Sequence, residues 1–135
     1  MVSVWVGRQR FEVGEADFLK AFFSTVFVKA EDKAWGRDYP VLMKEFYSGR
    51  LRHEKATAAL EELANLGGKL RTLPPGELVW DFEDPQKRPP WGNGISPHIT
   101  SLANYFVTSD GKDLLAVLAQ AFAEAAKKQL DALVH

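Results

Sequence analysis

The segment from Val79 to Asp110 constrains the fold more than any other part of the chain. It contains Trp80, Trp91 and four of the seven prolines. Proline fixes the backbone, and tryptophan offers a large contact area at a small entropic cost. The stretch from Asp84 to His98 also exceeds the usual length of an irregular connection. This composition predicts a loop of defined shape, either a binding loop or a tightly packed structural one.

The first half of the chain has clear periodicity. Alternating apolar residues predict strands over Val2 to Val6 and Phe11 to Val13, which form a hairpin. Helical spacing predicts a helix from Glu15 to Val28. A proline in the first turn and a terminal Ser-Gly pair predict a short helix from Val41 to Tyr47.

The middle of the chain predicts a third helix from His53 to Leu66, which Gly67-Gly68 stops unless Lys69 to Leu73 continues it after a kink. Alternation from Glu77 to Glu83 predicts a strand that buries Trp80 and turns the neighbouring acids outward.

Further along, Ser96 before Pro97 predicts an N-cap followed by one or two helical turns from Pro97 to Leu102. We expect another strand from Asn104 to Thr108. A long last helix is then expected from Lys112 to Leu133, with Asp110 as its N-cap. The order of these elements predicts one α+β domain over residues 1–135, with an antiparallel sheet of about four strands covered by helices and a long C-terminal helix.

Composition narrows the class of partner. The formal net charge is -1, so no overall field attracts nucleic acid or anionic lipid. The chain has no cysteine. It also lacks an apolar run near the roughly 20 residues that cross a membrane, and Arg8 and Arg10 interrupt any signal-like start. We therefore expect a cytoplasmic protein with neither nucleic-acid nor membrane partners.

Catalytic and metal-binding motifs are not assembled in the sequence. The three histidines, His53, His98 and His135, stand far apart, which argues against a zinc site. Gly92-Asn93-Gly94 lacks the following Lys-Ser/Thr of a phosphate loop and predicts a turn. Ser96 and His98 with Asp81 or Asp84 resemble a nucleophile set only in composition, because no elbow motif surrounds the serine. A helix cap explains Ser96 better than a catalytic nucleophile does. We also predict no cofactor.

Asp81, Glu83 and Asp84 admit three interpretations. They form a general acid–base pair, a solvated strand face, or an acidic contact surface for a basic partner. In the third case Trp91 supplies the buried anchor of the interface. These four residues are the predicted partner-binding site.

Three phrases of the sequence resemble one family of bacterial proteins. They are GEADFLKAFFST (Gly14 to Thr25), YPVLMKEFYSGRL (Tyr39 to Leu51) and the run from Val79 to Leu114 with its PPWG, ISP and NYFVTSDG motifs. These resemble the Imm70 immunity proteins, which are encoded beside polymorphic toxins. The resemblance implies a cytoplasmic, non-enzymatic α+β inhibitor whose partner is a cognate toxin domain.

Two other classes of function remain open from the residues alone. One is a small hydrolase or nucleotide-handling enzyme that uses the region from Asp81 to His98. The other is a structural or adaptor domain that dimerises through its alanine-rich last helix. The sequence leaves open whether the chain is a monomer or a homodimer.

Overall fold

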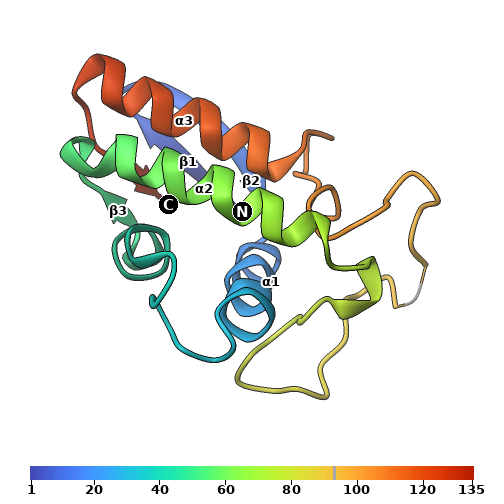
Figure 1. Ribbon diagram of the computed structural model, residues 1–135. Coiled ribbons are helices and arrows are strands. Elements are labelled where there is room, and N and C mark those ends of the chain that lie inside the picture. Colours follow the sequence, from blue (N-terminus) through green and yellow to red (C-terminus); the bar gives the residue numbers. More distant parts are fainter. Residues whose placement is uncertain (93) are drawn as a thin grey trace.

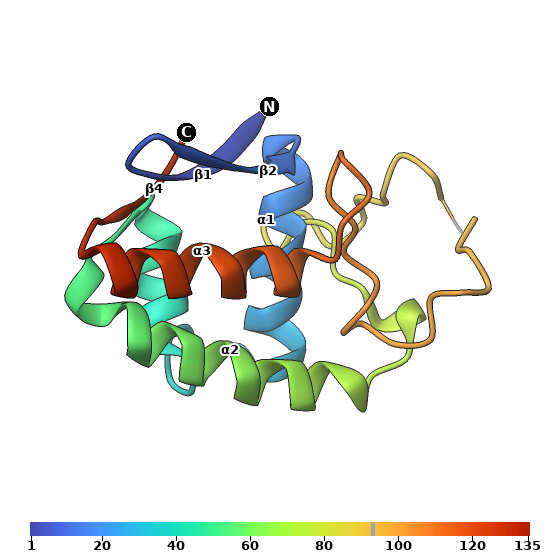
Figure 2. The same ribbon diagram turned by 90° about the horizontal axis from the view of Figure 1, so that it is seen from above.

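The computed structural model describes residues 1–92 and 94–135 and contains one four-stranded antiparallel sheet in the order β2-β1-β4-β3. Figure 2 shows the sheet along one side of the molecule, with the helices on one face of the sheet. This arrangement confirms the predicted α+β class. The strands are β1 (Val2–Val6), β2 (Gln9–Gly14), β3 (Arg50–Leu51) and β4 (Ala132–Val134).

The described residues form three α-helices and several shorter turns of helix. The α-helices are α1 (Ala16–Thr25), α2 (Ala56–Arg71) and α3 (Leu114–Lys128). The shorter ones are the π-helical η1 (Val26–Ala30) and η2 (Val41–Glu45) and the 3-10 turns η3 (Phe46–Ser48), η4 (His53–Lys55) and η5 (Pro75–Glu77). No helix in the described part of the chain is both long and apolar enough to span a membrane.

The N-terminal hairpin forms as predicted. Val4 and Val6 alternate with Trp5, and both valines are fully buried in the core. Trp5 lies on the outer face of the sheet, where its ring stacks on His135 at 5.6 Å between centroids. Gly7 has φ +60°, which suits glycine at the turn between β1 and β2.

The predicted first and second helices are also confirmed in position. The first is α1 continued by η1, and the second is η2 continued by η3. The second ends at Gly49, whose φ of +102° is a left-handed stop.

The predicted stop at Gly67-Gly68 is wrong, because α2 runs through both glycines to Arg71. Leu66 and Leu70 on either side of them are fully buried. The packing of this face outweighs a cost of about 1 kcal/mol for each glycine in a helix. Helices α2 and α3 lie side by side in both views (Figures 1 and 2).

The predicted end of the last helix is also wrong. Helix α3 stops at Lys128, Gln129 takes a left-handed conformation with φ +54°, and the chain returns as β4 between β1 and β3. A central position in the sheet lets β4 pair its backbone on both sides. The helix begins after Asp113, whereas the predicted cap, Asp110, accepts a hydrogen bond from Thr108.

The strands predicted over Glu77 to Glu83 and Asn104 to Thr108 do not form. The backbone of the first segment forms hydrogen bonds with the hydroxyl groups of Ser24 and Thr25 in α1 instead of with a neighbouring strand. The Ser24 hydroxyl accepts the N–H of Phe82 at 3.0 Å, and the Thr25 hydroxyl accepts the N–H of Val79 and donates to its carbonyl, each at 3.1 Å. The second segment forms one isolated bridge, between Val107 and Asp113.

These corrections leave a long irregular segment between η5 and α3, over residues 78–92 and 94–113. It gathers at one end of the molecule, beside α1 and the start of α3 (Figure 2). Phe106 anchors it, because this fully buried ring packs edge-on against Phe22 of α1 at 5.5 Å.

Candidate functional site

Trp91 is held in place by the irregular segment and yet remains at the surface. Its indole Nε1 donates a hydrogen bond to the Tyr105 hydroxyl at 2.8 Å, and its ring packs edge-on against Trp80 at 5.4 Å. The side chain is nevertheless 45% exposed. A large aromatic surface is therefore presented in one fixed orientation.

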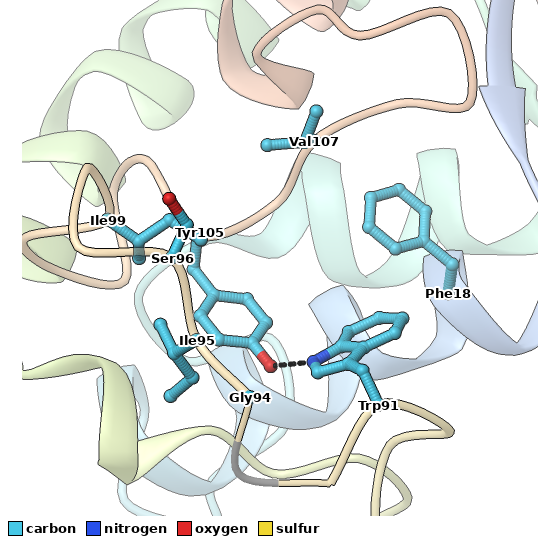
Figure 3. Close-up of a pocket in the computed structure, with 8 residues that line it drawn as sticks. All are labelled: Phe18, Trp91, Gly94, Ile95, Ser96, Ile99, Tyr105 and Val107. Carbon is cyan, nitrogen blue, oxygen red and sulfur yellow. Dashed lines mark hydrogen bonds between the residues drawn. The ribbon is translucent and has the colours of Figure 1, made fainter.

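An apolar pocket of about 260 Å³ lies against Trp91. Figure 3 shows the indole and Tyr105 joined by their hydrogen bond, with Phe18 beyond the indole. Among the residues that the structure describes, the lining consists of Phe18, Trp91, Gly94, Ile95, Ser96, Ile99, Tyr105 and Val107. All of these except Ser96 are glycine, aliphatic or aromatic residues, so the pocket favours an apolar occupant.

Tyr105 forms the inner wall of this apolar pocket. It is only 5% exposed, and burial raises the pKa of its hydroxyl above the ordinary 10.0. The phenol stays neutral at physiological pH and can continue to accept the Trp91 hydrogen bond.

A second pocket, of about 280 Å³, lies against the same tryptophan and also shares Phe18 with the first. Its lining includes the exposed acids Glu15 and Asp17, which stand at the start of α1. Sequence reasoning did not identify these two residues. Acids are common at helix N-termini, and only the fold brings them to Trp91.

Asp81 differs most from its predicted role. It is only 9% exposed, so the prediction that it points outward is wrong. Its carboxylate accepts the N–H of Glu83 at 2.9 Å and lies 3.3 Å from Lys20 Nζ and 3.9 Å from Lys87 Nζ. The backbone hydrogen bond from Glu83, followed by Lys20, lowers the pKa of Asp81. The residue holds a tight turn together.

Glu83 and Asp84 are exposed on this turn, as predicted. The Glu83 carboxylate lies 3.5 Å from Lys20 Nζ, and Asp84 accepts the N–H of Gln86 at 3.2 Å. The turn adjoins Trp91 through Trp80, which directly precedes Asp81 and is buried as predicted.

The alternative nucleophile set is not brought together in the described part of the chain. The Ser96 hydroxyl accepts the N–H of His98 at 3.3 Å, but the helical turns predicted after it are wrong, because only a turn at Pro97 and His98 forms. Asp81 is engaged with two lysines instead. The predicted turn at Gly92-Asn93-Gly94 falls on Asn93, outside the described residues.

One further cluster has metal-ligating side chains. His53, Glu54 and Asp131 have ligand atoms within 4.8 Å of one another. Asp131 accepts the backbone N–H of His53 at 3.0 Å and binds Arg50 at 2.8 Å, so a guanidinium already neutralises it. These bonds join the start of β4 to β3 and η4, which indicates a structural role.

Comparison with known proteins adds one match. A family model described as Immunity protein 70 matches residues 4–134, nearly the whole chain. Neither the curated proteins nor the solved structures give a match. The match spans the sheet, the helices and the irregular segment around Trp91.

Proposed function

Because the chain belongs to the Immunity protein 70 family, we propose that it binds and neutralises a cognate toxin domain in the bacterial cytosol. In this proposal it acts by forming a complex, without catalysis and without a cofactor. The partner-binding surface comprises Glu83, Asp84 and Trp91, with Asp81 as the residue that shapes the turn.

The main support for the proposed surface is that Trp91 is exposed and yet held in place. Interface anchors are enriched in tryptophan, and an anchor that is already rigid loses little entropy on binding. The hydrogen bond to Tyr105 and the contact with Trp80 fix the Trp91 ring before any partner arrives. Its 45% exposed surface is then available for burial.

Of the two exposed acids on this turn, Glu83 is paired with Lys20 at 3.5 Å, whereas Asp84 forms no ion pair within residues 1–92 and 94–135 and leaves a free carboxylate on the surface. Charges at the rim of an interface act mainly on the rate of association. A basic surface on the toxin is therefore the partner that this turn favours.

Co-expression with the toxin encoded in the adjacent gene tests the proposal. We expect the chain to protect cells and to form a complex with the toxin domain on a sizing column. Light scattering on the same column reports whether the free chain is a monomer or a homodimer. If the chain neither protects cells from this toxin and related ones nor binds them, the proposal is wrong.

Trp91→Ala should weaken toxin binding by about 2 kcal/mol or more, as for an anchor residue. Trp5→Ala is the matched control, since Trp5 is a partly exposed tryptophan on the outer face of the sheet, where its ring stacks on His135. Binding titrations beside thermal melts separate lost contact from lost stability. Equal affinity for both variants would remove Trp91 from the interface.

The double variant Glu83→Lys with Asp84→Lys should slow association, and the deficit should shrink at high salt as screening removes the repulsion. Asp81 is left intact because its replacement would open the turn. Glu61→Lys on α2 is the control for a change of charge at an exposed position. Stopped-flow association at two salt concentrations measures the effect, and identical rates for the double variant and wild type would contradict it.

A further inference from the structure

Two pockets meet at Trp91, and their linings differ in chemistry. One is the apolar pocket, and the other is the second pocket, an acidic pocket whose lining contains Glu15 and Asp17. Among the described residues the two share only Phe18 and Trp91. We propose that these two pockets bind two neighbouring residues of the toxin, an inference that rests on the proposed function. An apolar side chain enters the apolar pocket, and a lysine or arginine lies against Glu15 and Asp17.

The size of the apolar pocket suits one side chain. Its volume of about 260 Å³ is below the roughly 300–1,000 Å³ of pockets that enclose a drug-sized ligand. Trp91 and Val107, both 45% exposed, leave apolar surface uncovered at the pocket. An inserted apolar side chain would remove that surface from water.

The acidic pocket has two carboxylates that the fold leaves free for a partner. Within residues 1–92 and 94–135 neither Glu15 nor Asp17 forms an ion pair, and the Glu15 side chain does not cap α1. Lys20, the lysine of α1, is bound to Asp81 and Glu83 instead. The charge of this pocket is therefore complementary to a cation on the partner.

Trp91 connects the two halves of the site. The indole is an apolar wall for one pocket, and an aromatic ring also attracts a cation placed over its face. Since both pockets share this ring, the apolar and basic groups of the occupant must be close to each other. Neighbouring residues on one toxin segment meet that condition.

Dipeptide probes test this chemistry without the toxin. N-acetyl-Phe-Arg-amide should shift the Trp91 indole N–H resonance saturably, with a dissociation constant in the millimolar range. N-acetyl-Phe-Glu-amide should bind at least about fivefold more weakly. The indole resonance of Trp5, on the outer face of the sheet, is the internal control. Equal binding of the two probes, or no saturable shift at Trp91, would overturn the inference.

Two variants test the acidic pocket and the apolar pocket separately. Glu15→Gln with Asp17→Asn should abolish the preference for the arginine probe while the phenylalanine-dependent shift remains. Val107→Trp should block the apolar pocket and weaken both probes. Leu133→Trp is its matched control, because Leu133 is a 39% exposed residue on β4. Thermal melts of all three variants establish that the fold is intact, and probe binding unchanged by the first two would contradict the assignment.

The same variants distinguish this inference from the proposed function. If wild type binds the toxin, Val107→Trp should weaken the complex at least about tenfold and Leu133→Trp should not. A toxin complex of unchanged affinity in the pocket variants would refute the inference while the proposed function stands. If wild type binds no toxin, the proposed function fails, and the dipeptide result alone decides the chemistry of the pockets.

Discussion

Glu31 is a fully buried carboxylate that organises the loop between η1 and η2. It accepts the N–H groups of Gly36 at 3.0 Å, Asp38 at 2.9 Å and Tyr39 at 3.0 Å. Glu31→Gln keeps the size of the side chain but replaces one acceptor oxygen by a donor, which leaves buried N–H groups unpaired. We expect a loss of about 2–3 kcal/mol in the free energy of unfolding, measured by urea denaturation. Glu61→Gln, exposed on α2, should have almost no effect, and similar losses in both variants would contradict this role.

Single residues also show how far sequence reasoning reaches. The exposure of Trp91 and the burial of Trp80 followed from composition and alternation. Strand alternation predicts an outward Asp81, but this segment forms a turn, which directs the carboxylate to Lys20. Glu15 could not be assigned from sequence, because its nearness to Trp91 depends on the packing of a distant loop against α1.

Helix α2 contains a glycine at which a side chain would stabilise the protein. A Cβ on Gly68 would meet no atom within 4 Å, and the backbone there is helical. Gly68→Ala should raise the free energy of unfolding by about 0.5–1 kcal/mol, because alanine loses less backbone entropy in a helix. Gly49→Ala should instead destabilise the protein, since φ of +102° strains any residue with a Cβ. Thermal melts of the two variants should move in opposite directions, and a lower melting temperature for Gly68→Ala would be contrary to expectation.

Elements with a long periodic pattern can be predicted from the sequence, whereas the two shortest strands cannot. The hairpin and α1 have enough alternating or helically spaced residues to identify them. Strands β3 and β4 have only two and three residues, too few to show alternation, and long-range pairing defines them. The segment near Val79 does alternate, but hydroxyl groups of α1 bind its backbone in place of a neighbouring strand.

At the scale of the whole molecule, the two ends of the chain meet in the centre of the sheet. Strand β4 near the C-terminus pairs with β1 near the N-terminus, and β3 from the middle of the chain completes the other side. Because this pairing joins distant segments, the sheet cannot be complete until the last residues are in place. Asp131, directly before β4, fixes this closure through its bonds to His53 and Arg50.

Asp131 should therefore make the stability of the closed sheet depend on pH. The backbone N–H of His53, followed by its ring and by Arg50, lowers the pKa of Asp131 from the ordinary 3.8 to about 2. A carboxyl group whose pKa is lower in the folded chain stabilises it fully above the unfolded pKa, and this contribution is lost as the pH falls through the folded value. Between about pH 5 and about pH 2, wild type should lose more free energy of unfolding than Asp131→Asn, by on the order of 1 kcal/mol after solvent screening. Urea denaturation at each pH measures this difference between wild type and variant. The pH-dependent contributions of the other acids cancel in the difference, because both proteins contain them. Parallel pH profiles would show that the closure of the sheet does not depend on the charge of Asp131.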